Sequence, residues 1–354
     1  MPLNLRLDVP LNRRRLLRAT GSGIAASAAL ASLPSFAAGR EDRRPLALLL
    51  PLTGQHAALG LSMRQAALLA ESADMVQAYD TGGTAEGAAA AAAQALRRNP
   101  GAILGPLTGP EVPAVSGTVN GRVPIISFTN DAVQRAPGSW VFGITPSQVT
   151  SAILRYARGR GVRSVAIVDD GTPWSAASAV EAGRMESELG MRVAVVQPSS
   201  GALSFAPEDA PDAVLLPGSG EPMLAVARRL RGSGIQLLGT VQAIDNRPDA
   251  LEALDGAWIA GPDPERFGDF ATEYEARNGG SAGTITALAY DAASICHALR
   301  QRDALSGEGL LASQGFRCVT GAVRFRTDGS VARDFAILLA SHDGFEKVAA
   351  SSGA

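Results

Sequence analysis

The sequence predicts an α/β fold in which two doubly wound parallel-sheet lobes are joined by hinge crossovers. Short apolar runs bounded by Gly and Pro alternate with longer segments whose apolar residues recur at helical spacing, a pattern typical of alternating strands and helices. The alternation forms two series, and the Thr145-Pro146-Ser147 step between them indicates a hinge or lobe boundary. The 354 residues are 46% hydrophobic, which is enough to bury two cores.

Four strand-and-helix units make up the first series. The expected strands are residues 46–50, 75–79, 102–104 and 123–126. A helical pattern runs from Ala57 to Ala73, and Thr84 can cap an alanine-rich helix that ends at Arg98. Small or polar residues follow each strand, and the carboxyl ends of parallel strands lie along one edge of a sheet. We therefore expect a ligand cleft at this edge.

A second series follows the Thr145-Pro146-Ser147 step, where a helix begins and runs to about residue 158. The expected strands are residues 164–168, 192–196, 213–216, 236–238 and 257–260, with helices near 173–189, 219–232, 265–277 and 284–300. The tail from Ala322 to Gly344 has the alternation and turn residues of antiparallel strands. We expect lobe I to comprise residues 44–144 plus 265–328, and lobe II residues 145–264 plus 329–350.

The amino terminus has the pattern of an export signal. Basic residues from Arg13 to Arg18 precede a mildly apolar Ala/Gly/Ser stretch that ends near Ala37. Paired arginines followed by leucines favour the twin-arginine type, so we expect residues 1–37 to be removed on export to the periplasm. A membrane anchor is the alternative, but the stretch is short and is broken by Pro34. No cysteine lies near the cleavage position, which argues against lipid attachment there.

Charge and cysteine content narrow the possible partners. Removal of residues 1–37 takes away five arginines and one aspartate and leaves 27 basic and 33 acidic residues, a net charge of −6. This mildly acidic balance argues against nucleic acid as a partner. The only two cysteines are Cys296 and Cys318. A disulfide between them and two inert buried thiols are both compatible with the sequence.

No set of residues typical of a catalytic centre is present. The Gly-x-Ser-x-Gly, His-Glu-x-x-His, Cys-x-x-Cys and phosphate-loop motifs are absent, and the three histidines are scattered. Asp169-Asp170 lies at a strand end, but no further acidic residues follow at the spacing of a calcium loop. We therefore expect neither an enzyme nor a resident metal or cofactor.

A small-solute site at the strand ends would use hydroxyls, backbone amides and an aromatic wall. The lobe I candidates are Thr53, Gln55, His56, Thr108, Gly109, Ser127, Thr129 and Asn130. The lobe II candidates are Asp170, Thr172, Trp174, Ser219, Gln242 and Asp245. Turn or helix capping is the alternative role for these residues, above all for Thr108, Thr172 and Ser219, and a solvated loop position is the alternative for His56.

The chain after the export signal resembles the type I periplasmic solute-binding proteins of the leucine-binding-protein family. The resemblance covers residues 44–348 and rests on the order and spacing of several motifs. These are Leu50-Pro51-Leu52-Thr53-Gly54, Ala58-Leu59-Gly60, Gly105-Pro106-Leu107-Thr108, Val123-Pro124-Ile125-Ile126-Ser127, Ala289-Tyr290-Asp291-Ala292, and Phe325 with Asp328-Gly329. The resemblance implies a soluble periplasmic receptor that closes over a small polar solute, an amino acid or derivative, and delivers it to an ABC-type membrane permease.

At the ligand positions of this family the match is partial. The positions that match the family's carboxylate-binding hydroxyls are Gly109, Thr129 and Asp131. Only Thr129 keeps a hydroxyl, and Asp131 would repel an anion. The family's acidic group for the ligand ammonium falls near Gln242, where no acid stands, although Asp245 is close. Trp174 matches an aromatic residue that covers the ligand. Because the other ligand positions largely differ, the resemblance supports the fold more firmly than it supports an amino-acid ligand.

The chain also resembles the terminal domain of the penicillin-binding-protein activators, which stimulates a peptidoglycan synthase. This resemblance is local and lies in residues 49–54, 79–81 and 103–107. The sequence shows neither the helical-repeat amino-terminal domain nor the lipidated cysteine of the enterobacterial activators. We expect a solute receptor, and an activator-like regulator of peptidoglycan synthesis is the alternative.

Overall fold

The structure is a computed structural model that describes residues 42–198, 205 and 209–351. The chain divides into two compact units, residues 1–40 and 41–354, and all described residues belong to the second unit. The expected export signal, with its cleavage position near Ala37, lies outside the described residues. Within the described residues, no helix combines the length and the apolar character needed to cross a membrane.

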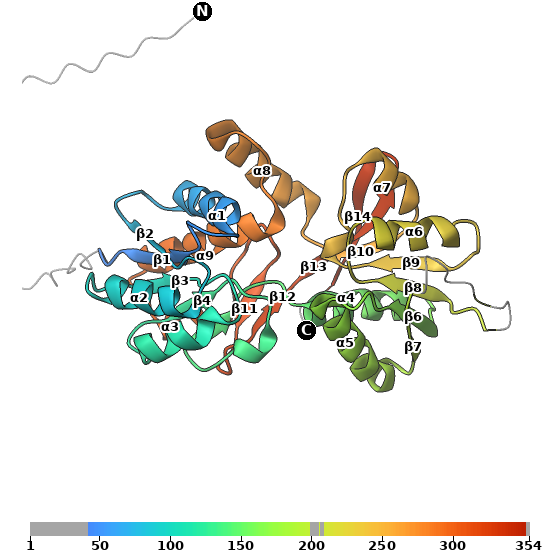
Figure 1. The fold of residues 1–354 in the computed structure, drawn as a ribbon, viewed down its shortest axis with the longest axis horizontal. Helices are drawn as coiled ribbons and strands as arrows, with labels where there is room; N and C mark the ends of the chain where they lie inside the picture. Colours follow the sequence, from blue (N-terminus) through green and yellow to red (C-terminus); the bar gives the residue numbers. More distant parts are fainter. Residues whose placement is uncertain (1–41, 199–204, 206–208, 352–354) are drawn as a thin grey trace, which may run out of the picture. The chain divides into compact units, whose positions relative to one another are not determined.

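Five parallel strands form the first sheet, in the order β2-β1-β3-β4-β5. They are β1 (Leu46–Leu50), β2 (Val76–Asp80), β3 (Ala102–Leu104), β4 (Ile125–Ser127) and β5 (Ser139–Val141). The helices of this half are α1 (Ala57–Ala70), α2 (Ala85–Leu96), α3 (Glu111–Val119), the short η2 (Ala132–Gln134) and, from much later in the chain, α9 (Thr284–Arg300). We call this half, on the left of Figure 1, lobe I.

Alternate residues of β1 face two different helix layers. Leu46, Leu48 and Leu50 share a core with α1 and α9, whereas Ala47 and Leu49 share a core with α2 and α3. Successive side chains of a strand point to opposite faces of its sheet, so both faces of lobe I are covered. A strand buried on both faces is uniformly apolar, which explains why β1 is recognisable in the sequence.

Seven strands form the second sheet, in the order β14-β13-β10-β9-β8-β6-β7. Its parallel strands are β6 (Ser164–Val168), β7 (Arg192–Val196), β8 (Ala213–Leu216), β9 (Gln236–Gly239) and β10 (Trp258–Gly261), and the antiparallel pair β13 (Phe335–Ser341) and β14 (Gly344–Ser351) completes one edge. The helices are α4 (Pro146–Gly159), α5 (Pro173–Leu189), α6 (Glu221–Leu230), α7 (Pro248–Ala253) and the short η3 (Val241–Ala243). We call this half, on the right of Figure 1, lobe II.

The described chain passes between the lobes three times, as Figure 1 shows. The first passage runs from β5 to α4, and the second runs from β10 through α8 (Pro264–Asn278) to α9. The third follows α10 (Gly307–Leu310) and the hairpin of β11 (Val323–Phe325) and β12 (Val331–Arg333). β12 pairs with β11 in a separate two-stranded sheet. The chain therefore joins the second sheet only at Phe335, the first residue of β13, whereas the sequence suggested a change of lobe at residue 329.

The predicted strands and helices are present, and the differences at their ends have local causes. Thr84 and Thr172 each accept a hydrogen bond from the backbone N–H three residues later, and Thr145 forms a capping box with Gln148. Helix α1 ends at Ala70, three residues early, because Glu71 is extended and its buried carboxylate pairs with an arginine of α9. Helix α7 has only six residues, too few for a periodic pattern to reveal it.

A buried polar cluster ties α9 to β12. Asp291 of α9 accepts hydrogen bonds from the Val319 N–H (2.8 Å), the Thr320 N–H (3.0 Å) and the Thr320 hydroxyl (2.5 Å). Arg333 of β12 donates to the Thr320 hydroxyl and to the Phe142 carbonyl (2.7 Å), with its guanidinium 4.8 Å from the centre of the Phe142 ring. Burial raises the pKa of Asp291 and lowers the pKa of Arg333, and shared hydrogen bonds compensate the two buried charges.

Cys296 and Cys318 are buried, free thiols in the structure. Of the two alternatives left open by the sequence, the structure therefore has the pair of buried thiols. Burial raises the pKa of the Cys296 thiol to about 12 and the pKa of the Cys318 thiol well above its usual range. Both side chains behave as small apolar groups of the lobe I core.

Candidate binding cleft between the lobes

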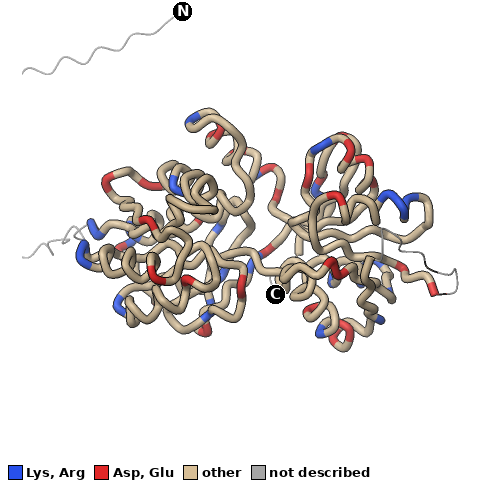
Figure 2. Tube along the Cα trace, in the orientation of Figure 1, with Lys and Arg blue, Asp and Glu red and all other residues tan. Residues whose placement is uncertain are grey.

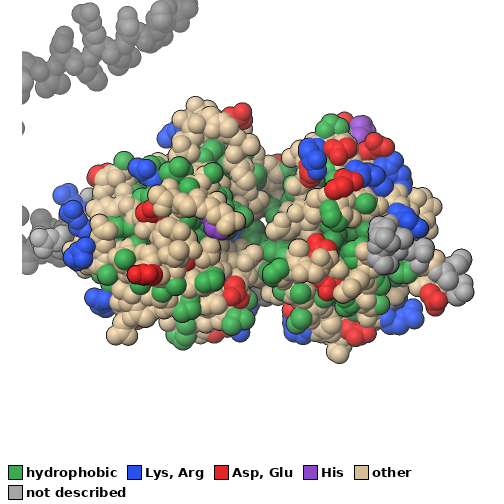
Figure 3. All heavy atoms as spheres, in the orientation of Figure 1, with side chains coloured by type: hydrophobic (Ala, Val, Ile, Leu, Met, Phe, Trp, Pro, Cys, Tyr) green, Lys and Arg blue, Asp and Glu red, His purple; other side chains and the backbone are tan. Residues whose placement is uncertain are grey.

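A cavity of about 930 Å³ lies between the lobes, where the carboxyl ends of both sheets meet. The space-filling view in Figure 3 shows a hollow between the lobes with apolar side chains along its edges. The lining consists of His56, Leu59, Leu107, Thr108, Gly109, Phe128, Thr129, Asn130, Ile144, Trp174, Ser219, Gly220, Val241, Gln242, Ile244, Asp245, Asn246, Gly283, Thr284, Ile285, Thr286 and Leu288. Open parallel sheets bind ligands at this edge.

Most of the predicted site residues come together around this cavity. The predicted residues that line it are His56, Thr108, Gly109, Thr129, Asn130, Trp174, Ser219, Gln242 and Asp245. They lie on the segments that follow β1, β3 and β4 in lobe I and β6, β8 and β9 in lobe II. Residues from six separate strand ends therefore meet at one cavity.

Five predicted residues do not line the cavity, namely Thr53, Gln55, Ser127, Asp170 and Thr172. Thr53 donates to Asp80 (2.7 Å), and the buried Ser127 hydroxyl donates to the Trp140 carbonyl (2.9 Å). Asp170 accepts from the Thr172 N–H (3.0 Å) and hydroxyl (2.7 Å), and the exposed Gln55 stands outside the lining. Asp170 and Thr172 serve the start of α5, and Ser127 bonds to the neighbouring strand β5, so local hydrogen bonds use polar groups at the same strand ends as ligand contact.

The lobe I hydroxyls of the cavity are held by neighbouring groups. The Thr108 hydroxyl donates to the fully buried carboxylate of Glu111 (2.7 Å), which leaves its lone pairs for a ligand. The Thr129 hydroxyl accepts from the Asp131 N–H (3.1 Å). A Cβ atom built on Gly109 would stand 3.2 Å from an Asp131 carboxylate oxygen, so a ligand anion at Gly109 and Thr129 would lie beside a carboxylate.

Trp174 forms part of the lobe II wall. It lies in the first turn of α5, directly after the Thr172 cap and Pro173. The side chain is partly buried and packs against the large core cluster that contains residues of both lobes. Its indole Nε1–H is buried and has no hydrogen-bond partner among the described residues. The indole thus supplies a large aromatic face at a position fixed by a helix start.

Sequence reasoning missed the start of α9. Gly283, Thr284, Ile285, Thr286 and Leu288 all line the cavity. No side chain caps the helix at Gly283, so the N–H groups of its first turn are not used by a cap. The sequence shows Gly283-Thr284-Ile285-Thr286 at the start of a long helix. Only the packing of α9 along α1, which the sequence does not show, brings this segment to the cleft.

The cavity combines an apolar wall with uncharged hydrogen-bonding groups. Its apolar members include Leu59, Leu107, Phe128, Ile144, Val241 and Ile244. Asp245 is the only acidic residue of the lining, and neither Lys nor Arg lines it. The hydrogen bonds from Arg247 hold the pKa of Asp245 below its usual range. A cleft of this composition suits a solute with both an apolar and a polar part.

A family model described as periplasmic binding protein matches residues 45–344 of the chain. The chain therefore belongs to the periplasmic binding protein family, in agreement with the resemblance found in its motifs. The match covers both lobes and every segment that lines the cavity. No curated protein sequence matches the chain.

Solved structures share this fold at low sequence identity. A protein described as a branched-chain amino acid ABC transporter from Rhodospirillum rubrum is 22% identical, with a TM-score of 0.73 over 86% of this chain and 100% of its own. LivJ from Streptococcus pneumoniae, a branched-chain amino acid transporter substrate binding protein solved with isoleucine, is 18% identical, with a TM-score of 0.60 over 87% and 99%. The LpoA C-domain from Haemophilus influenzae, a regulator of PBP1A, is 16% identical, with a TM-score of 0.68 over 86% and 100%. At these identities the likeness shows the type I periplasmic binding protein fold alone.

Proposed function

We propose that the protein is a periplasmic solute receptor that binds a small polar solute, an amino acid or derivative, and presents it to an ABC-type membrane permease. The observation that carries this proposal is the cavity, whose lining comes from the strand ends of both lobes. Closure of two lobes about their crossovers buries a solute held between them. The proposed lobes are residues 44–144 plus 265–328 and residues 145–264 plus 329–350, with β12 as part of the crossover.

Trp174, Thr108 and Thr129 carry the proposed contacts with the solute. In the closed state the indole of Trp174 covers the apolar part of the solute, and the two hydroxyls contact its polar part. Ser127, which the sequence also suggested, has no part in this proposal because its hydroxyl is buried against Trp140. The chemistry proposed for the cleft is binding, without catalysis.

Family membership supports the proposed location and partner. The family consists of periplasmic binding proteins, and two of the similar structures come from ABC transporter systems. Twin-arginine export and signal removal near Ala37 belong to this proposal, since those residues lie outside the described part of the chain. Recovery of the protein from the periplasmic fraction with an amino terminus near residue 38 would support this location.

A thermal-shift screen of the purified protein tests solute binding. The panel contains amino acids, short peptides, aromatic acids and cell-wall fragments. A solute present at 100 times its dissociation constant adds about 2.7 kcal/mol to the free energy of unfolding, which raises the melting temperature measurably. A clear rise with one chemical class supports the receptor function, and a flat screen contradicts it.

A regulator of peptidoglycan synthesis is the second candidate, because the LpoA C-domain, a regulator of PBP1A, shares the fold over its whole length with a TM-score of 0.68, within the range of 0.60 to 0.73 found for the two ABC transporter proteins. This candidate predicts a protein partner and a cleft that stays empty. Binding of the purified protein to a purified peptidoglycan synthase, combined with a flat solute screen, would favour it. Solute binding without synthase binding would exclude it.

A further inference from the structure

The only carboxylate in the lining of the cleft is already paired. The Arg247 Nε atom lies 3.1 Å from Oδ1 and 3.0 Å from Oδ2 of Asp245, and Nη2 lies 2.7 Å from Oδ2. The Arg247 backbone N–H also donates to Oδ1 (3.0 Å). Asp245 therefore has both carboxylate oxygens occupied, and a fixed positive charge stands beside it.

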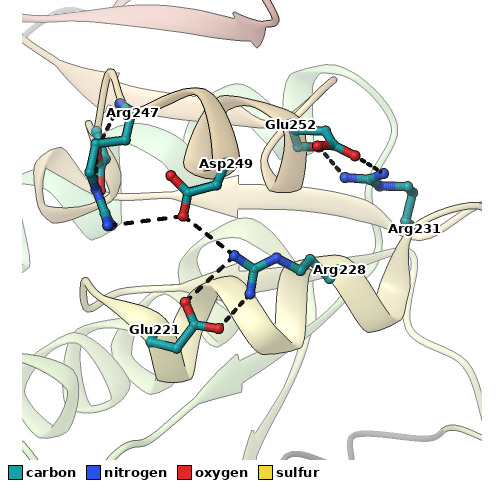
Figure 4. Close-up of polar contacts among 7 residues, drawn as sticks. Glu221, Arg228, Arg231, Arg247, Asp249 and Glu252 are labelled. Atoms are coloured by element: carbon teal, nitrogen blue, oxygen red, sulfur yellow. Dashed lines mark hydrogen bonds and ion pairs between the residues drawn. The ribbon is translucent and has the colours of Figure 1, made fainter.

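Further charges surround this pair on α6 and α7. Asp249 lies 3.9 Å from Arg247 and 3.7 Å from Arg228, which also pairs with Glu221. Arg231 pairs separately with Glu252 (2.9 Å). Figure 4 shows these contacts, and Figure 2 shows the acidic and basic positions gathered on this part of lobe II. The arginine that neutralises Asp245 is thus built into a wider set of charges behind the cleft wall.

The remaining lining offers no substitute partner for a cation. The other polar side chains of the lining are His56 and uncharged hydroxyl and amide groups. An ammonium that leaves water for a cleft whose lining has no free carboxylate loses hydration without equivalent compensation. Two further carboxylates lie near the cleft but outside its lining. Glu111 is fully buried and bonded to Thr108. The Asp131 oxygens accept hydrogen bonds from the Val133 N–H (3.1 Å) and the Gln134 amide (2.9 Å) of its own turn.

We propose that the Asp245–Arg247 pair sets the ligand class of the cleft, so that it takes a small amphipathic solute without a cationic group. Such a solute has a branched or aromatic apolar body and one head that bears a carbonyl or hydroxyl. Apolar residues of both lobes contact the body, and hydroxyls and amides contact the head. This inference rests on the proposed receptor function and narrows its solute to an amine-free derivative.

Matched ligand series test the class directly by isothermal titration calorimetry. One series is leucine, 4-methylpentanoate and 4-methylpentanamide, and the other is phenylalanine, 3-phenylpropanoate and 3-phenylpropanamide. Any solute found in the thermal-shift screen is compared with its aminated or amine-free counterpart in the same way. We expect an amine-free member to bind at least tenfold more tightly than its amino acid. Equal or tighter binding of the aminated member overturns the inference and leaves the receptor function intact. An absence of all binding, including a flat screen, overturns the receptor function and this inference with it.

Two variants test the role of the ion pair itself. Arg247→Gln leaves the Asp245 carboxylate without its cation. The ratio of the dissociation constants of an amino acid and its amine-free counterpart should therefore move about tenfold in favour of the amino acid. Arg231→Gln is the matched control, because it removes an arginine of the same region that pairs with Glu252 instead. The control should leave the ratio unchanged within twofold.

Asp245→Asn tests the role of the ion pair independently of whether the Arg247 variant folds. This change removes the nearer of the two carboxylates that pair with Arg247 and leaves only Asp249 at 3.9 Å, so the ratio of dissociation constants should move further against the aminated member. The melting temperature without solute checks that each variant is folded. An unchanged ratio in both folded variants overturns the role of the pair.

Discussion

At the scale of single residues, the function of a polar side chain at a strand end depends on which neighbour takes its hydrogen bond. Ser127 is the last residue of β4, and Thr129 lies two residues later. The Thr129 side chain lines the cleft, whereas the Ser127 hydroxyl is buried and bonded to the Trp140 carbonyl. The sequence could place both residues at the edge of the sheet. It could not separate them, because ligand contact and turn formation select the same residue types.

Trp174 provides the sharpest prediction at this scale. Replacement by Ala removes the aromatic face, and the free energy of solute binding should become less favourable by about 2–4 kcal/mol. Trp174→Phe keeps an aromatic ring and should lose much less. Calorimetric titration of both variants with the solute found by the screen measures the difference. An affinity unchanged in a folded Trp174→Ala variant would remove this residue from the site.

At the scale of elements, the strands and most helices were predictable because burial on two sides leaves a clear sequence pattern. β1 is a run of five apolar residues, and α2 and α4 begin at identifiable threonine caps. The contribution of α9 to the cleft was not predictable. Its first turn reaches the cleft only because α9 packs along α1, more than 200 residues earlier in the chain. Long-range packing of this kind leaves no local signal.

The buried cluster of Asp291, Thr320 and Arg333 supports the second prediction, which concerns how elements are joined. Replacement of Arg333 by Met leaves Asp291 and the Phe142 carbonyl without their cationic neighbour, at a cost of about 3–5 kcal/mol in the free energy of unfolding. Urea unfolding measures this loss.

The control for this prediction is Arg324→Met. Arg324 lies on the neighbouring strand β11, but its side chain is 43% exposed and its pair with Asp334 is 3.6 Å long. This change should alter stability by no more than about 0.5 kcal/mol. Equal losses in the two variants would show that the buried cluster contributes nothing particular.

At the scale of the whole described molecule, two exposed valines lie on opposite sides of a second opening between the lobes. Val133 of lobe I is 84% exposed and Val180 of lobe II is 76% exposed, and both line a cavity of about 410 Å³ beside Trp174. Exposed apolar side chains gain free energy when closure of a gap removes them from water. We therefore expect closure of the lobes over solute to bury both valines.

This expectation gives the third prediction. The radius of gyration from small-angle X-ray scattering should decrease when solute is added, and Val180→Asp should weaken both this decrease and the affinity, by about tenfold, because closure would bury a charge. Val195→Asp is the control, since Val195 is 54% exposed but lies on the edge strand β7. Equal effects of the two changes would contradict closure at this opening.

The three passages between the lobes also govern how the protein is made. A ribosome completes the parallel strands of lobe II before it reaches α9, the helix that covers one face of β1. Until Thr284 to Arg300 has been synthesised, the leucines on that face have only part of their cover, so a nascent or truncated chain exposes apolar surface that favours aggregation. Lobe I, although first in sequence, is among the last parts of the molecule that can be completed during synthesis.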